Sequence, residues 1–118
     1  MNDILGREVE QGDLVFILDA YGSGVVLKLA KVVGFTRTLV KLERPDCLKT
    51  RQYFLNNNIQ MEINQTSKKK SNGLLKTSNE DAVRWIENNF EGNPHYDREQ
   101  HTEYLTQRRE VYTEYFIG

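Results

Sequence analysis

The sequence is poor in residue types that small proteins use for disulfides, metal sites and catalysis. Its 118 residues include one cysteine, Cys47, two histidines and two prolines. A single cysteine excludes an internal disulfide and a cysteine-rich zinc site, because each needs at least two thiols. No apolar run reaches the roughly 18 residues of a membrane-spanning helix. The first residues lack the basic start and apolar stretch of a secretory signal, so we expect a cytoplasmic protein that does not enter a membrane.

Residues that could form an active site do not occur in a recognisable pattern. His95 and His101 are six residues apart, whereas helical metal pairs usually lie four apart. Cys47 has no base beside it in the sequence to activate its thiol. Residues 21–24 lack the Gly-Lys-Ser/Thr ending of a phosphate-binding loop. We therefore expect no enzyme activity, no cofactor and no metal site.

Charge is unevenly distributed along the chain, although the net charge is only −1. Residues 1–63 carry eight basic and eight acidic side chains. Residues 64–77 carry four lysines and no acid, and residues 78–118 carry four arginines against nine carboxylates. This pattern predicts three segments with different neighbours. A protein that coats duplex DNA is normally basic throughout, so any role with nucleic acid must rest on a local patch.

The first half of the chain has the period-two alternation and the turn spacing of short strands. The pattern predicts strands near residues 13–19, 25–33, 39–43 and 59–63, with a strand or a turn at 50–54. Five short strands in this length favour an antiparallel barrel, which hides its edges by closing on itself. The residues that we expect in its core are Val15, Ile17, Leu27, Val33, Val40 and Ile63.

Several short motifs in residues 3–63 carry a family resemblance. The opening Asp3-Ile4-Leu5-Gly6-Arg7, with the segments 31–36 and 40–42, resembles SH3-like, KOW-type barrels. The combination is similar to small proteins of large tailed bacteriophages that begin with Ile-Leu-Gly-Arg. The resemblance implies a barrel that binds protein, RNA or DNA through its loops, and it implies the cytoplasm of a host bacterium as the location. Fold alone does not name the ligand.

The second half predicts two helices. Ser78 begins a capping pattern, with acids in the first turn of a helix that ends before Gly92. Asn93-Pro94 has the chemistry of a second helix start, and this helix is expected to run to Phe116. The predicted organisation is therefore an α+β protein, with an SH3-like five-stranded antiparallel barrel at 1–63, a basic connector at 64–77 and a helical hairpin-like tail at 78–118 packed on the barrel.

The second helix carries an apolar and aromatic stripe with two possible roles. The stripe either packs inward or binds a protein partner, since aromatic side chains are enriched at interfaces. It is wide enough for two lines about 100° apart, so we expect one line to bind a partner or a second copy of the chain. The candidate protein-binding residues are Tyr104, Arg108, Val111, Tyr112, Tyr115 and Phe116.

The lysine cluster in the connector also has two interpretations. It is either a solvated, mobile and exposed linker or an arm that contacts phosphates. The candidate nucleic-acid-binding residues are Lys68, Lys69, Lys70, Arg37 and Tyr21. The sequence thus leaves two functions open. The first is a non-enzymatic protein-binding factor, expected to be an early phage protein that modulates host machinery or a host defence protein. The alternative is a nucleic-acid-binding module that uses the barrel loops and the lysine arm.

Overall fold

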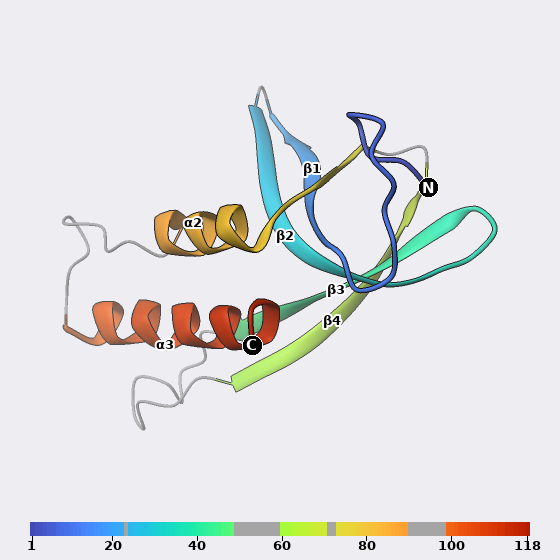
Figure 1. Ribbon diagram of the computed structural model, residues 1–118. Helices are drawn as coiled ribbons and strands as arrows, with labels where there is room; N and C mark the ends of the chain where they lie inside the picture. Colours follow the sequence, from blue (N-terminus) through green and yellow to red (C-terminus); the bar gives the residue numbers. More distant parts are fainter. Residues whose placement is uncertain (23, 49–59, 71–72, 90–98) are drawn as a thin grey trace. The chain divides into compact units, whose positions relative to one another are not determined.

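The computed structural model describes residues 1–22, 24–48, 60–70, 73–89 and 99–118 (Figure 1). Their secondary structure consists of β1 (Leu14–Tyr21), β2 (Gly24–Phe35), β3 (Leu39–Leu48), β4 (Gln60–Lys69), β5 (Leu74–Lys76), α2 (Asn79–Asn89) and α3 (Glu99–Phe116). The chain forms two compact units. One comprises Met1–Arg44 and Asn64–Ala82, and the other comprises Pro45–Ile63 and Val83–Gly118.

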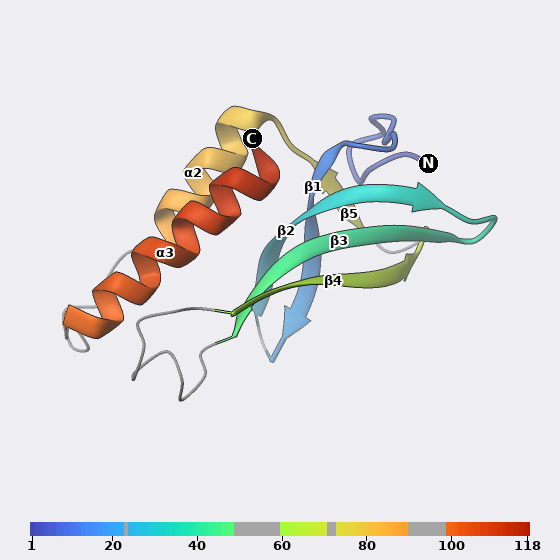
Figure 2. The ribbon, with the colours of Figure 1, turned by 90° about the horizontal axis from the view of Figure 1, so that it is seen from below.

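The five strands form one antiparallel sheet in the order β4-β3-β2-β1-β5. The strands β1 to β4 follow one another as a meander, and β5 returns to the free side of β1, where Ile17 pairs with Leu74. Figure 2 shows β2, β3 and β4 running side by side. A sheet followed by two helices confirms the predicted α+β class. The sheet is open within the described residues, with β4 and β5 at its two ends, so the predicted closure into a barrel is not observed.

The main apolar core of the sheet lies on one face and confirms half of the predicted core. It consists of Val9, Val15, Ile17, Ala30, Val32, Val40, Leu42 and Leu74, all buried. The predictions for Leu27 and Ile63 were wrong, since these residues are 39% and 44% exposed, and Val33 is only half-buried. The pairing of Val15 with Ala30 places the even-numbered residues of β2 on the core face. A bulge between Val32 and Gly34 then shifts the register, which sequence alternation alone does not reveal.

The segment predicted to be a connector differs in the structure. Strand β4 continues through Lys69, and Leu74–Lys76 forms β5, so both elements belong to the sheet. The Gln65 side-chain amide donates to Glu43 at 2.8 Å, and the amide of Lys70 donates to the carbonyl of Thr38 at 3.0 Å. Pairing with β3 holds this polar strand through its backbone, so the strand forms without the apolar alternation that a sequence pattern requires.

The helices keep their predicted types but not all of their predicted limits. At the start of α2, the hydroxyl of Ser78 accepts a hydrogen bond from the amide of Asp81 at 3.2 Å, as the capping pattern predicted. The predicted start of the second helix at residues 93–94 lies outside the described residues. The Trp85 and Tyr112 rings join α2 to α3 with their centroids 6.3 Å apart. Among the described residues, no helix is long and apolar enough to cross a membrane.

Candidate nucleic-acid interface

The turn between β2 and β3 is held by its own hydrogen bonds. The amide of Thr36 donates to the carbonyl of Leu39 at 2.9 Å, and the amide of Leu39 donates to the hydroxyl of Thr36 at 3.0 Å. Side-chain bonds of this kind fix a turn without help from the core. The exposed side chain of Arg37 is therefore carried on a well-defined turn.

Lys70 brings the end of β4 onto this turn. Its amide bonds to Thr38, and its ammonium donates to the carbonyl of Arg37 at 3.2 Å. The same ammonium lies 5.7 Å from the centre of the Phe35 ring, within the range of a cation–π contact. Phe35 is 37% exposed. The structure thus gathers an arginine, a lysine and a partly exposed aromatic ring at one end of the sheet.

We call this end of the sheet the basic tip, defined as residues 34–41 and 66–70. It carries five cations and no carboxylate, and its cations are Arg37, Lys41, Lys68, Lys69 and Lys70. The Arg37, Lys41 and Lys69 side chains are exposed, and those of Lys68 and Lys70 are half-buried. A group of cations without carboxylates among them attracts phosphates, which are negatively charged.

Tyr21 is not part of the basic tip, although the sequence grouped it with these residues. It pairs with Gly24 at the start of β2, whereas Phe35 is the last residue of that strand. Eleven residue steps lead from Gly24 to Phe35, which is about 35 Å along the strand. The structure therefore brings together four of the five predicted nucleic-acid-binding residues and excludes Tyr21.

The predicted protein-binding stripe on α3 divides into buried and half-buried lines. Tyr112 and Phe116 are 1% and 5% exposed, and their rings stack with centroids 5.9 Å apart. Val111 and Tyr115 are half-buried, and Tyr115 meets Phe116 edge to face at 4.9 Å. The guanidinium of Arg108 lies 5.6 Å from the centre of the Tyr112 ring. The side chain of Tyr104 lies outside the described residues.

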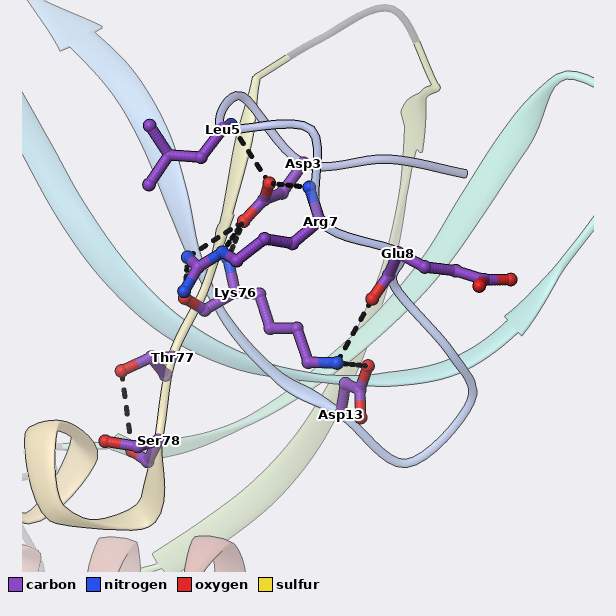
Figure 3. Close-up of polar contacts among 8 residues, drawn as sticks. All are labelled: Asp3, Leu5, Arg7, Glu8, Asp13, Lys76, Thr77 and Ser78. Carbon is purple, nitrogen blue, oxygen red and sulfur yellow. Dashed lines mark hydrogen bonds and ion pairs between the residues drawn. The ribbon is translucent and has the colours of Figure 1, made fainter.

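A second polar cluster, around Asp3, was not predicted from the sequence (Figure 3). The Asp3 side chain is fully buried. It accepts hydrogen bonds from the amides of Leu5 and Lys76 at 3.0 Å, and from the amide and the guanidinium of Arg7 at 2.8 and 2.9 Å. The Asp-x-x-Gly turn at the start of the chain is a recognisable turn signal, and Gly6 has a φ of 80°. The contact with Lys76, 73 residues away, has no local signal.

The ionisation of Asp3 decides what this cluster can do. Burial raises the pKa of the carboxyl, but the hydrogen bonds from Arg7, Lys76 and Leu5 outweigh burial and lower the pKa from 3.8 to about 2. The group is ionised at neutral pH and holds no proton to donate. The hydrogen bonds of the Asp3 cluster therefore join the N-terminal turn to β5. An ionised carboxylate does not suit general acid catalysis.

A shallow cavity of about 620 Å³ lies next to the Asp3 cluster. Its lining residues are Arg7, Glu8, Glu10, Lys76, Thr77 and Ser78. The Lys76 ammonium lies 3.3 Å from the Asp13 carboxylate and donates to the carbonyl of Glu8 at 3.1 Å. The described residues contain no group of three or more potential metal ligands. The cations Arg7 and Lys76 in the lining are balanced by the carboxylates of Glu8 and Glu10, whereas the charged residues of the basic tip are all cations.

Comparison with known proteins gives a family but no function. A family model described as "Domain of unknown function (DUF7205)" matches residues 1–70. No curated protein and no solved structure matches the chain. The matched residues include all of the basic tip and end before β5.

Proposed function

We propose that this protein, which belongs to the DUF7205 family by the match of its model to residues 1–70, is a non-enzymatic module that binds nucleic acid through the basic tip. The observation that carries the proposal is the position of Lys70. Three contacts fix it against Thr38, Arg37 and Phe35, so cations from two separate parts of the sequence meet at one end of the sheet.

The proposed interaction is electrostatic and blind to sequence. Five cations permit up to five phosphate contacts, which predicts a slope of about −3.5 in a plot of log affinity against log salt for a single strand. The net charge of the whole chain is −1, so attraction depends on the local field of the tip. Binding is expected to be clear at low salt and weak at physiological salt.

Two exposed arginines provide a matched test of this proposal. Arg37 lies in the basic tip and Arg84 lies on α2, and neither side chain is buried. In a salt titration with a labelled oligothymidylate, Arg37→Ala is expected to make the slope about 0.7 less steep, and adding Lys69→Ala is expected to do so again. Arg84→Ala is expected to leave the slope unchanged. Absence of binding at low salt, or equal effects of the two arginine variants, would refute the proposal.

Protein binding is a second candidate, and the burial pattern of α3 favours it. Tyr112 and Phe116 are buried, while Val111 and Tyr115 remain half-buried beside the exposed carboxylates Glu110 and Glu114. An aromatic line flanked by acids suits a partner with a basic rim. The partner could be a host protein, as the resemblance to phage barrels implies, or a second copy of the chain.

The candidate partner-binding line can be tested in a cytoplasmic extract of a bacterium, the setting that this resemblance proposes. Immobilised protein should retain a specific partner, and Tyr115→Ala should lose it while Tyr115→Phe keeps it. Equal capture of the partner by both variants would show that Tyr115 does not contribute to its binding.

A further inference from the structure

We infer that the basic tip selects single-stranded over duplex nucleic acid, with Phe35 as the surface on which a base stacks. This inference rests on the proposed function and names the class of ligand. It follows from two features of the tip: the place of the aromatic ring among the cations, and the distribution of the cations over both faces of the sheet.

Phe35 has the position and the support of a stacking platform. It ends β2 and pairs with Val40, which is completely buried, so the backbone beneath the ring is fixed by the core. The ring itself keeps 37% of its surface exposed. Nucleobases stack on such rings irrespective of sequence, because every base presents a π face.

Lys70 adds a phosphate contact beside that ring. In the free protein its ammonium rests near the Phe35 ring and on the carbonyl of Arg37. The hydrogen bond to the carbonyl is exposed and has a neutral acceptor, whereas a phosphate oxygen carries a full negative charge, so the ammonium can turn to a phosphate while the ring receives a base. A base on Phe35 and a phosphate on Lys70 are neighbouring parts of one nucleotide strand.

The cations of the tip are divided between the two faces of the sheet. Gly34 pairs with Lys41 and Phe35 pairs with Val40, so Lys41 lies on the face opposite Phe35. Alternation likewise places Lys68 and Lys69 on opposite faces of β4. A rigid duplex presents its phosphates to one face and keeps its bases stacked inside. A flexible single strand can pass around the tip, reach both faces and still offer an unpaired base to Phe35.

The test compares a single strand with a duplex on the full-length protein. The probes are a labelled oligothymidylate of about 12 nucleotides and a duplex of the same length, within the usual site size of small single-strand-binding modules. Phe35→Leu keeps an apolar side chain against the core and removes the π face. It is expected to weaken binding of the single strand about 5- to 150-fold, while its salt slope stays that of the natural protein. Phe35→Trp is expected to retain or strengthen binding.

The outcomes separate this inference from the proposed function. Preference for the single strand, lost in Phe35→Leu and kept in Phe35→Trp, supports the inference. Equal binding of both probes, or a Phe35→Leu variant that binds the single strand normally, overturns the inference. In that case a slope that still depends on Arg37 leaves the proposed function standing. Failure of the natural protein to bind either probe at low salt overturns both.

Discussion

At the scale of single residues, the Asp3 side chain accepts four hydrogen bonds within the first unit. Its carboxylate accepts bonds on both oxygens from Leu5, Arg7 and Lys76, and these bonds tie the N-terminal turn to β5. A buried carboxylate is stable only when its lone pairs are satisfied. If the carboxylate is removed, the amides of Leu5, Arg7 and Lys76 lose their acceptor, whereas the Arg7 guanidinium is 48% exposed and can turn to water.

Replacing Asp3 is expected to destabilise the fold more than replacing Asp13. In Asp3→Asn one carboxylate oxygen becomes an amide that faces the donors of Arg7 or Lys76 instead of accepting from them. Asp13 also contacts Lys76, but its side chain is 23% exposed and water can replace the lost acceptor. Thermal unfolding followed by circular dichroism should show a clearly lower midpoint for Asp3→Asn than for Asp13→Asn. Equal midpoints would show that the hydrogen bonds of Asp3 do not stabilise the fold more than the contact of Asp13 does.

The contribution of Asp3 to stability is expected to depend on pH in one direction only. The pKa in the folded protein is about 2 and the ordinary value is 3.8, so the folded state holds the ionised form more strongly than the unfolded state does. The stabilisation is thus complete above about pH 4 and is lost as the pH falls from there through about 2. Urea unfolding measures the difference in the free energy of unfolding between natural protein and Asp3→Asn. This difference should be constant from neutral pH to about pH 5 and should decrease in acid. An undiminished difference in the free energy of unfolding at pH 2 would contradict the lowered pKa of Asp3.

At the scale of elements, α3 shows how an aromatic stripe divides between core and surface. Tyr112 contacts Trp85 and Phe116 and is almost completely buried, whereas Tyr115 touches Phe116 at its edge and stays half-buried. Tyr112→Ala should therefore lower the free energy of unfolding by about 3–5 kcal/mol, as large aromatic truncations in cores do. Tyr115→Ala should cost about 1 kcal/mol. Chemical denaturation of the two variants measures both values, and a larger loss at Tyr115 would reverse the assignment of core and surface.

The elements also show which features of the fold were predictable. The strands near residues 13–19 and 25–33 and the capped helix after Ser78 have local signals, and the structure has β1, β2 and α2 there. The register shift between Val32 and Gly34 lies where a glycine inside a strand is a bulge signal, whereas the choice of core face in β2 has no local signal. That choice is set by the pairing of Val15 with Ala30, which places Val32 instead of Val33 in the core. The extension of β4 and the short β5 depend on pairing with β3 and β1, which are distant in sequence. Polar strands of this kind are stabilised by pairing with neighbouring strands, so the side-chain pattern predicts strands that are too short or misses them.

The candidate interface was predictable in its charges but not in its geometry. The three consecutive lysines and Arg37 were recognisable as cations in the sequence. Their meeting depends on the hydrogen bond between Lys70 and Thr38, which joins residues 32 positions apart. The same non-local pairing places Phe35 beside Lys70 and leaves Tyr21 at the other end of β2. The function proposed here is therefore a consequence of strand order.

At the scale of the whole molecule, positive and negative charge are concentrated in different parts of the sequence. The tip carries five cations, while residues 78–118 carry nine carboxylates against four arginines. A polyanion is attracted to the first region and repelled by the second, so binding should be confined to one end of the sheet. The proposed contact with nucleic acid is therefore expected at one surface of the protein, the basic tip.

Amide chemical-shift mapping during titration with oligothymidylate at low salt tests nucleic-acid binding at the basic tip, because it locates the ligand without any substitution. We predict that the shifts concentrate on residues 35–38 and on Lys68, Lys69 and Lys70, and that they reverse when salt is raised. The amides of α3 between Arg108 and Phe116 are predicted to stay unchanged. Shifts that concentrate on α3 or on the N-terminal turn, or a spectrum that does not change at all, would contradict nucleic-acid binding at the basic tip.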